Sequence, residues 1–264
     1  MSTPLALRIT GIGAWTPGAP GWQLLRDILR GEAAAMGDAP ARPAGTILPA
    51  AERRRAPDGV RLAAEVAAQA ISMAGIDPAT VPCVFASTQG ELAITDYVCE
   101  TLARSPLELS PTKFHNSVLN APAGYWTIAT GCTAASSAVT AHHRSFAAGL
   151  LEAAVFACAE DTPVLFASCD VASTGPLAEM TRTTLAFGMA MLLHPNASDG
   201  ARLDLALHGG TTESVPVVTM TTVARDNPAN AEALALLSLL ARANPSNLRL
   251  PLSSGLSLDM EIEP

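Results

Sequence analysis

The stretch FHNSVLNAPAGYWTIATGC, residues 114–132, carries more information than any other part of this chain. Its alanines and glycines from Asn120 to Gly131 indicate a helix, after which Cys132 would lie in a loop. Three bulky aromatic side chains also occur here, at Phe114, Tyr125 and Trp126. Ordinary packing in a core explains Tyr125 and Trp126 as well as a functional role does, because buried aromatics are common.

Upstream of this stretch, the pattern predicts strands and helices separated by glycine- and proline-rich turns. Residues 31–57 lack periodicity and predict a long surface loop. Within that loop Arg53, Arg54 and Arg55 form a basic run, which we interpret as solvated in preference to a docking patch for an acidic partner. The predicted elements are a strand at 5–13, a helix at 21–30, a helix at 60–74 closed by Gly75, and a buried strand at 83–87.

Downstream, residues 133–151 are helical in composition, and 153–159 form an apolar run typical of a buried strand. Residues 184–193 and 201–207 predict two strands that pair antiparallel through a turn. A helix is expected at 230–243, and the tail from Pro245 shows little pattern. The alternation of strands and helices predicts an α/β domain with a mainly parallel sheet covered on both faces.

Composition narrows the class of protein. The chain has 264 residues and a net charge of −8, which argues against a nucleic-acid partner. No apolar run is long enough for a membrane span, and the N-terminus lacks the pattern of a signal peptide, so we expect a cytoplasmic protein. The cysteines have no CxxC spacing, so we expect reduced thiols and neither disulfides, metal nor cofactor.

Several segments resemble the N-terminal half of β-ketoacyl synthases, the condensing enzymes of fatty-acid and polyketide assembly. The similarity runs from about residue 5 to 210 and implies an α/β fold, a thiolase-like half (N-terminal β-ketoacyl synthase-like domain) with a mixed sheet covered by helices. It implies a domain at 5–210 and a truncated C-terminal segment with one helix and a tail at 211–264. The matching segments are Ile9–Pro17, Gly75–Thr88, Asn120–Gly131, Gly149–Glu160 and Phe187–Leu193.

Within that family the chain is similar to short, stand-alone proteins of the chain-length-factor type that accompany a complete synthase in aryl polyene and related biosynthesis. This resemblance implies a non-catalytic subunit that forms a heterodimer with a complete β-ketoacyl-ACP synthase and meets acyl carrier protein through that partner. The chain ends where a full synthase would be little more than half built, so we do not expect it to condense alone. The similar runs are His115–Val118, Ala121–Trp126, Ala129–Gly131 and Ser145–Ala153.

Cys132 is the candidate catalytic residue. Condensing enzymes hold a cysteine at a helix N-terminus, where the helix dipole stabilises the thiolate, and Ile128–Thr133 resembles that strand-to-helix turn. A second register, in which 120–131 is the preceding helix, moves the nucleophile position to His142-His143 or deletes it. The sequence alone leaves both registers open, and we favour an unreactive Cys132.

The histidines weigh against catalysis. The family draws two catalytic histidines from its second half, whereas no histidine follows His208 here. His142 and His143 lie in a stretch predicted helical, where adjacent side chains diverge by about 100°. The alternative function is an acyltransferase or condensing enzyme that uses Cys132 as its nucleophile, and a third is a plain scaffold.

A second set of site residues follows from the expected heterodimer. Bulky residues at its interface would close the acyl tunnel of the partner and limit chain length by occupying volume. For His115 a hydrogen-bonded structural role is the favoured alternative. The candidate tunnel or interface residues are Phe114, His115, Asn116, Tyr125 and Trp126.

Overall fold

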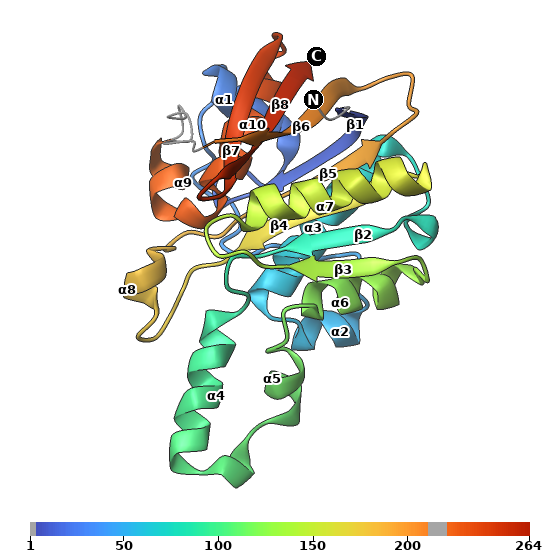
Figure 1. Cartoon of the computed structure of the whole chain (residues 1–264). Helices are drawn as coiled ribbons and strands as arrows, with labels where there is room; N and C mark the ends of the chain where they lie inside the picture. The colour runs from blue at the N-terminus through green and yellow to red at the C-terminus, as the bar shows by residue number, and fades with distance from the viewer. Residues whose placement is uncertain (1–3, 211–220) are drawn as a thin grey trace.

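The computed structural model describes residues 4–210 and 221–264, which form one eight-stranded sheet with helices on both faces (Figure 1). The strands are β1 (Leu5–Trp15), β2 (Cys83–Ala86), β3 (Ser136–Val139), β4 (Val164–Asp170), β5 (Phe187–His194), β6 (Ala201–Gly209), β7 (Ser246–Ser253) and β8 (Leu256–Glu263). The helices are α1 (Trp22–Arg30), α2 (Ala50–Arg55), α3 (Asp58–Ala74), α4 (Leu92–Arg104), α5 (Pro111–His115), α6 (Ala121–Thr130), α7 (Ser145–Glu160), α8 (Ala178–Thr181), α9 (Thr221–Asp226) and α10 (Ala231–Arg242), with short 3₁₀ turns η1 (Pro78–Thr80), η2 (Pro106–Glu108) and η3 (Pro228–Asn230).

The sheet is mixed, as the resemblance implied. Its order is β3-β2-β4-β5-β1-β6-β8-β7, and among the described strands only β2 pairs in parallel, with β3 and with β4. The other neighbours run antiparallel. The prediction of a mainly parallel sheet is therefore wrong, because helical crossovers join few of the neighbouring strands.

Strand β1 separates the two strands that were predicted to pair with each other. β5 and β6 lie on opposite sides of β1, and both run antiparallel to it. The short link between them crosses β1 at Gly200, where a Cβ would lie 2.4 Å from the Ile9 carbonyl oxygen. Only a glycine tolerates that approach together with its φ of 90°. The predicted β5–β6 hairpin is therefore wrong, although both strands exist.

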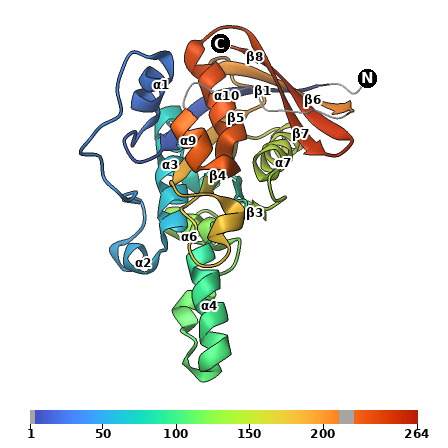
Figure 2. The same cartoon turned by 90° about the vertical axis from the view of Figure 1, so that its left-hand side faces the viewer.

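Each face of the sheet carries its own hydrophobic cluster. On one face α3 lies so close to β1 that a Cβ on Gly11 or Gly13 would come within 2.1 Å of a helix carbonyl oxygen. Residues of α1, α7 and α10 form the cluster on the other face. Figure 2 shows α3 and α7 on opposite sides of the sheet. A register shift between Ile9 and Gly11 switches the side of β1 that faces this second cluster. The prediction that helices cover both faces is confirmed.

The region from 133 to 160 differs from the prediction. The stretch expected to be helical contains β3, and the helix α7 begins only at Ser145. The apolar run 153–159, expected to be a strand, lies inside α7, and the central strand is β4. Alanine explains the error, because an alanine-rich buried helix is as uniformly apolar as a buried strand.

Two other segments are more ordered than predicted. The expected patternless tail forms the hairpin β7–β8, which extends the sheet beyond β6. The expected loop 31–57 contains the short helix α2. Leu248 and Leu250 in β7 are buried at every second position, so the alternation typical of a strand was present in the sequence.

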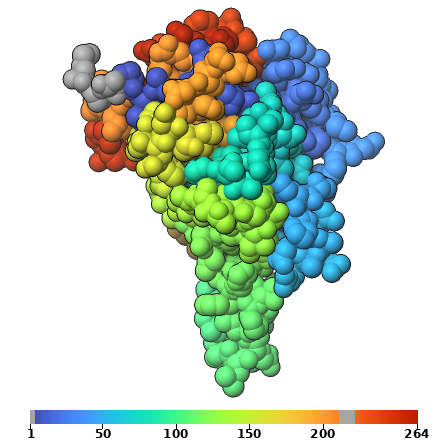
Figure 3. Space-filling view, turned by 90° about the vertical axis from the view of Figure 1, so that its right-hand side faces the viewer, coloured from blue at the N-terminus to red at the C-terminus, as the bar shows by residue number. Residues whose placement is uncertain are grey.

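Helices α4 and α5 form an arm that projects from the body of the molecule (Figures 1 and 2). The space-filling view shows the same projection from a third side (Figure 3). Within the arm the Ser110 N–H donates to the Tyr97 hydroxyl at 3.2 Å, and the Lys113 ammonium lies 4.5 Å from the centre of the Tyr97 ring. The arm exposes several large apolar side chains, namely Leu102, Leu107, Phe114 and, just beyond α5, Val118.

Candidate functional site

The turn from a strand into a helix lies between β3 and α7, not at Cys132. It is formed by residues 140–144, and His142 adopts the left-handed conformation there with φ 53°. The hydroxyl of Ser145 donates to the His142 carbonyl at 2.7 Å and fixes the turn. The prediction that His142 and His143 lie within a helix is therefore wrong. Their rings are arranged edge to face, with the ring centres 3.9 Å apart. Burial lowers the pKa of His143, and the neighbouring His142 and Arg144 add to this effect.

A buried carboxyl occupies the N-terminus of α7. Glu232 of α10 accepts a hydrogen bond from the Ala147 N–H and pairs with Arg144 at 3.3 Å. Burial raises the pKa of Glu232 to about 7, against the influence of Arg144. The positive end of the helix dipole, which would stabilise a thiolate in a condensing enzyme, therefore faces a side chain of the same chain.

Cys132 lies in the loop that follows α6, as the second register required. Its backbone N–H donates to the Thr127 carbonyl, and its buried thiol donates to the Val81 carbonyl at 3.4 Å. The prediction that residues 128–133 form a strand-to-helix turn is wrong, because α6 runs to Thr130 and Gly131 ends it. Cys132 thus gains no stabilisation from a helix N-terminus.

A polar network lies beside the turn between β3 and α7, and the sequence analysis did not identify it. The buried Asp170 carboxylate at the end of β4 accepts from the Ser87 hydroxyl at 2.8 Å and from the Asn230 amide at 3.0 Å. Burial raises the pKa of Asp170 to about 6, opposed by these bonds and by those from Thr88. Asn227 ties the network to β4 by donating to the Asp170 carbonyl at 3.0 Å. The sequence analysis identified Asn230 only as the expected start of the helix at 230–243.

Three of the five predicted tunnel or interface residues point into the chain. The buried Tyr125 hydroxyl donates to the Asn116 side-chain oxygen at 3.0 Å. The amide of Asn116 in turn donates to the Arg55 carbonyl at 3.0 Å. Trp126 packs in the cluster under α3, with its ring 6.5 Å from that of Phe85. The core packing considered as the alternative for Tyr125 and Trp126 is what the structure shows.

The other two predicted residues point outward. Phe114 on α5 is 58% exposed, and His115 beside it is exposed as well. The His115 ring lies 6.3 Å from the ring of Tyr125. The structure therefore divides the predicted set into an inner group, Asn116, Tyr125 and Trp126, and an outer pair.

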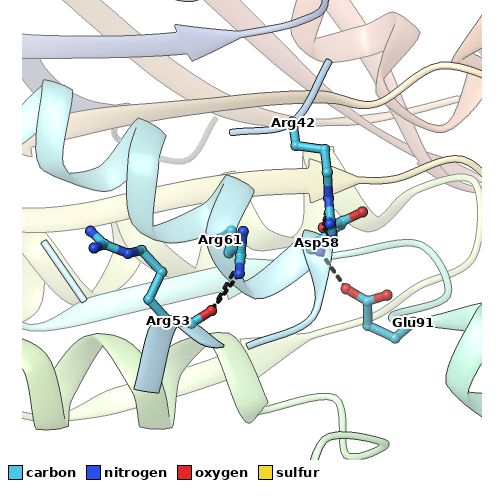
Figure 4. Close-up of polar contacts among 6 residues, drawn as sticks. Arg42, Arg53, Asp58, Arg61 and Glu91 are labelled. Carbon is cyan, nitrogen blue, oxygen red and sulfur yellow. Dashed lines mark hydrogen bonds and ion pairs between the residues drawn. The ribbon is translucent and has the colours of Figure 1, made fainter. Parts of the chain in front are cut away.

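A groove of 790 Å³ runs between the arm and the body. Four cations line it (Arg42, Arg54, Arg55 and Lys113) together with two acids, Asp58 and Glu91. Figure 4 shows Arg42 against Asp58 and the Glu91 carboxyl directed at the start of α3. The basic run was expected in a loop but lies in α2, because Pro49 and Pro57 delimit one helical turn and a half between them. The groove is locally basic although the chain is acidic.

Among the described residues, no group of three or more His, Cys, Asp or Glu side chains converges as metal ligands would. The described helices include none with the length and apolar character required to cross a membrane.

The mixed eight-stranded sheet with helices on both faces is the thiolase-like fold of ketosynthases. The model of the family described as "Beta-ketoacyl synthase, N-terminal domain" matches residues 29–252, and the chain belongs to that family. A search of curated proteins found no match.

Solved structures with the same fold include multi-subunit ketosynthases. One is the ketosynthase ApeO in complex with its chain length factor ApeC from Xenorhabdus doucetiae, with 24% identity, a TM-score of 0.72, and coverage of 99% of this chain and 100% of that one. The ishigamide ketosynthase/chain length factor has 14% identity, a TM-score of 0.71 and 99% coverage of both chains. AntDE:AntF, a type II PKS acyl-carrier protein in complex with its ketosynthase, has 11% identity, a TM-score of 0.70, and coverage of 100% of this chain and 99% of that one.

Proposed function

We propose that this chain is the non-catalytic, chain-length-factor-type subunit of a complete β-ketoacyl-ACP synthase. The proposal rests on the turn that precedes α7. His142 lies in this turn, and the Glu232 carboxyl binds the N-terminus of α7. A nucleophile at this place would need a thiol and a free helix N-terminus. Neither requirement is met, so the chemistry is assigned to the partner.

Two features support a heterodimer. β3 lies at the edge of the sheet, so the backbone groups along its outer side are free to pair with a strand of another chain. Beside that edge, Ile128 on α6 is 69% exposed, and the arm adds Phe114 and Val118. Exposed apolar side chains of this size are typical of a protein interface.

Within the heterodimer Phe114 is the residue that limits the acyl chain. It is the exposed aromatic of the predicted set, whereas Tyr125 and Trp126 support the wall from inside. The product class we propose is an aryl polyene or a related polyketide or fatty-acid-like chain, made in the cytoplasm. Acyl carrier protein reaches the complex through the partner, and the basic groove offers its acidic surface a contact.

Co-expression with the synthase from the same gene neighbourhood tests the proposal. We expect the two chains to co-purify, and Phe114→Ala to lengthen the products while the complex still forms. Phe114→Trp should shorten them, because the larger ring fills more of the tunnel. The matched control is Leu107→Ala, which removes an exposed apolar side chain elsewhere on the arm. A stable monomer that binds no synthase would contradict the heterodimer, and unchanged products from both Phe114 variants would favour a plain scaffold.

The alternative, an acyltransferase that uses Cys132, is tested by thiol chemistry. We expect a cysteine-directed reagent to modify the exposed Cys99 first and to leave the buried Cys132 intact in the folded protein. Rapid, saturable acylation by an acyl-carrier thioester that persists in Cys99→Ser and disappears in Cys132→Ser would overturn the non-catalytic assignment.

A further inference from the structure

The two roots of the arm converge on one corner of the body. The first root is Glu91, which precedes α4, and the second is Asn116, which follows α5. Glu91 accepts hydrogen bonds from the N–H groups of Gly59 and Val60, at the start of α3. Asn116 donates to the carbonyl of Arg55, at the end of α2. Both roots are thus attached to the backbone of residues 55–60, which joins α2 to α3.

We propose that Glu91 and Asn116 form a clamp that sets the direction of the α4–α5 arm relative to the body. The residues of this clamp are Glu91, Asn116 and the corner 55–60. A role of the arm in docking on the synthase rests on the proposed function. The clamp does not, because it consists of contacts within this chain.

The geometry of each root fits such a role. A side chain at position 59 would displace the first root, because a Cβ there would lie 2.5 Å from the Glu91 carboxylate oxygen. Gly90, next to Glu91, has φ 64° and is a backbone position at which the chain can turn. At the second root the Tyr125 hydroxyl donates a hydrogen bond to the side-chain oxygen of Asn116. This bond orients the Asn116 amide nitrogen toward Arg55. Between the roots a cavity of 30 Å³ remains, large enough for a water molecule.

The charge environment makes the first root sensitive to pH. Burial is the main cause that raises the pKa of Glu91 to about 7. The nearby acids Asp58 on α3 and Asp170 on β4 contribute in the same direction, and the hydrogen bonds from the Gly59 and Val60 N–H groups oppose the rise. Arg42 offsets Asp58 by pairing with it, and the remaining cations of the groove, Arg54, Arg55 and Lys113, line its outer part. The attached position favours the neutral carboxyl, so ionisation favours release into the groove. The clamp therefore loosens as pH rises through about 7 and tightens as pH falls.

The position of the arm can be measured directly. Cys99 is an exposed thiol on α4, and Met73 on α3 is 59% exposed, so Met73→Cys provides a second label on the body. In a Cys158→Ser background, spin labels at these two sites report the arm-to-body distance. We expect a narrow distribution in the parent protein at about pH 6 and a broader one at about pH 8.

Three variants address the clamp. Glu91→Ala should broaden the distribution at both pH values, and Glu91→Gln should keep it narrow at both, because the amide accepts the same bonds without titrating. Gly59→Ala should broaden it by displacing the carboxyl, while leaving a good helix former at the start of α3. Glu100→Ala is the matched control, since it removes an exposed acid of the same helix that pairs with Arg104.

The outcomes separate the clamp from the proposed function. An unchanged distribution in both Glu91→Ala and Gly59→Ala, in protein that remains folded, would overturn the clamp. A broadened distribution with a roughly tenfold weaker complex with the synthase supports the clamp and the arm as docking surface together. A broadened distribution with unchanged synthase affinity supports the clamp and removes the arm from the interface.

Discussion

Single side chains in residues 114–132 have two kinds of surroundings that sequence alone did not separate. Tyr125 and Trp126 are adjacent and both buried, but Tyr125 has a polar partner in Asn116 and Trp126 packs under α3. Phe114 is exposed only eleven positions before Tyr125. Which of these aromatic side chains faces solvent depends on where α5 ends and α6 begins. The sequence pattern of residues 114–132 does not determine these two boundaries. The choice between the registers of Cys132 was open for the same reason.

Tyr125→Phe tests how much the hydrogen bond from Tyr125 to Asn116 stabilises the fold. Removal of the hydroxyl leaves the buried Asn116 oxygen without its donor, so we expect the free energy of unfolding to fall by about 1–2 kcal/mol. Urea denaturation measures the change. Tyr97→Phe is the control: its oxygen accepts a hydrogen bond at a half-buried site, where water can replace it, and the loss should be smaller. Equal losses in the two variants would argue against a special role for the Tyr125–Asn116 pair.

At the scale of elements, prediction succeeded where local signals were complete. Helix α3 was expected with its end at Gly75, and the structure has that glycine in the left-handed conformation. It failed for α7, because an alanine-rich sequence without a polar face gives no period to recognise. The β5–β6 pairing failed for a different reason. The intervening strand comes from the other end of the sequence, and no local pattern reports it.

Gly13→Ala tests the packing of α3 on β1. A Cβ at this position would lie 2.0 Å from the Val66 carbonyl oxygen, so helix and strand must separate. We expect a loss of about 3 kcal/mol or more in the free energy of unfolding. Gly124→Ala in α6 is the matched control, because nothing lies within 4 Å of its Cβ position. There the better helix former should be neutral or add up to about 1 kcal/mol. If the Gly13 variant were as stable as the parent, the close contact would be refuted.

At the scale of the molecule, three buried acids among the described residues have raised pKa values, chiefly because of burial. They are Glu91 and Glu232, each to about 7, and Asp170, to about 6. In the unfolded chain such groups ionise near 4.5 for glutamate and 3.8 for aspartate. Between these values and about 7 the folded state binds more protons than the unfolded state. Stability therefore decreases as pH rises across this window and levels off above it.

The test is urea unfolding at intervals from about pH 5 to about pH 8, where each proton difference contributes at most about 1.4 kcal/mol per pH unit. We expect the free energy of unfolding to fall with rising pH. Glu232→Gln should flatten the slope, because the group no longer titrates, and Asp38→Asn, at an exposed acid, should leave it unchanged. A free energy that rises over this range would contradict the raised pKa values.

The place of β1 between β5 and β6 affects how the chain can fold as it is made. β1 leaves the ribosome before the other described strands, yet its neighbours β5 and β6 follow about 170 positions later, which corresponds to roughly 10–30 s of synthesis. During that interval both edges of an apolar strand remain unpaired in the nascent chain and open to wrong pairing. Yield in cells should therefore respond to chaperones that hold nascent chains, more than to the stability of the finished fold.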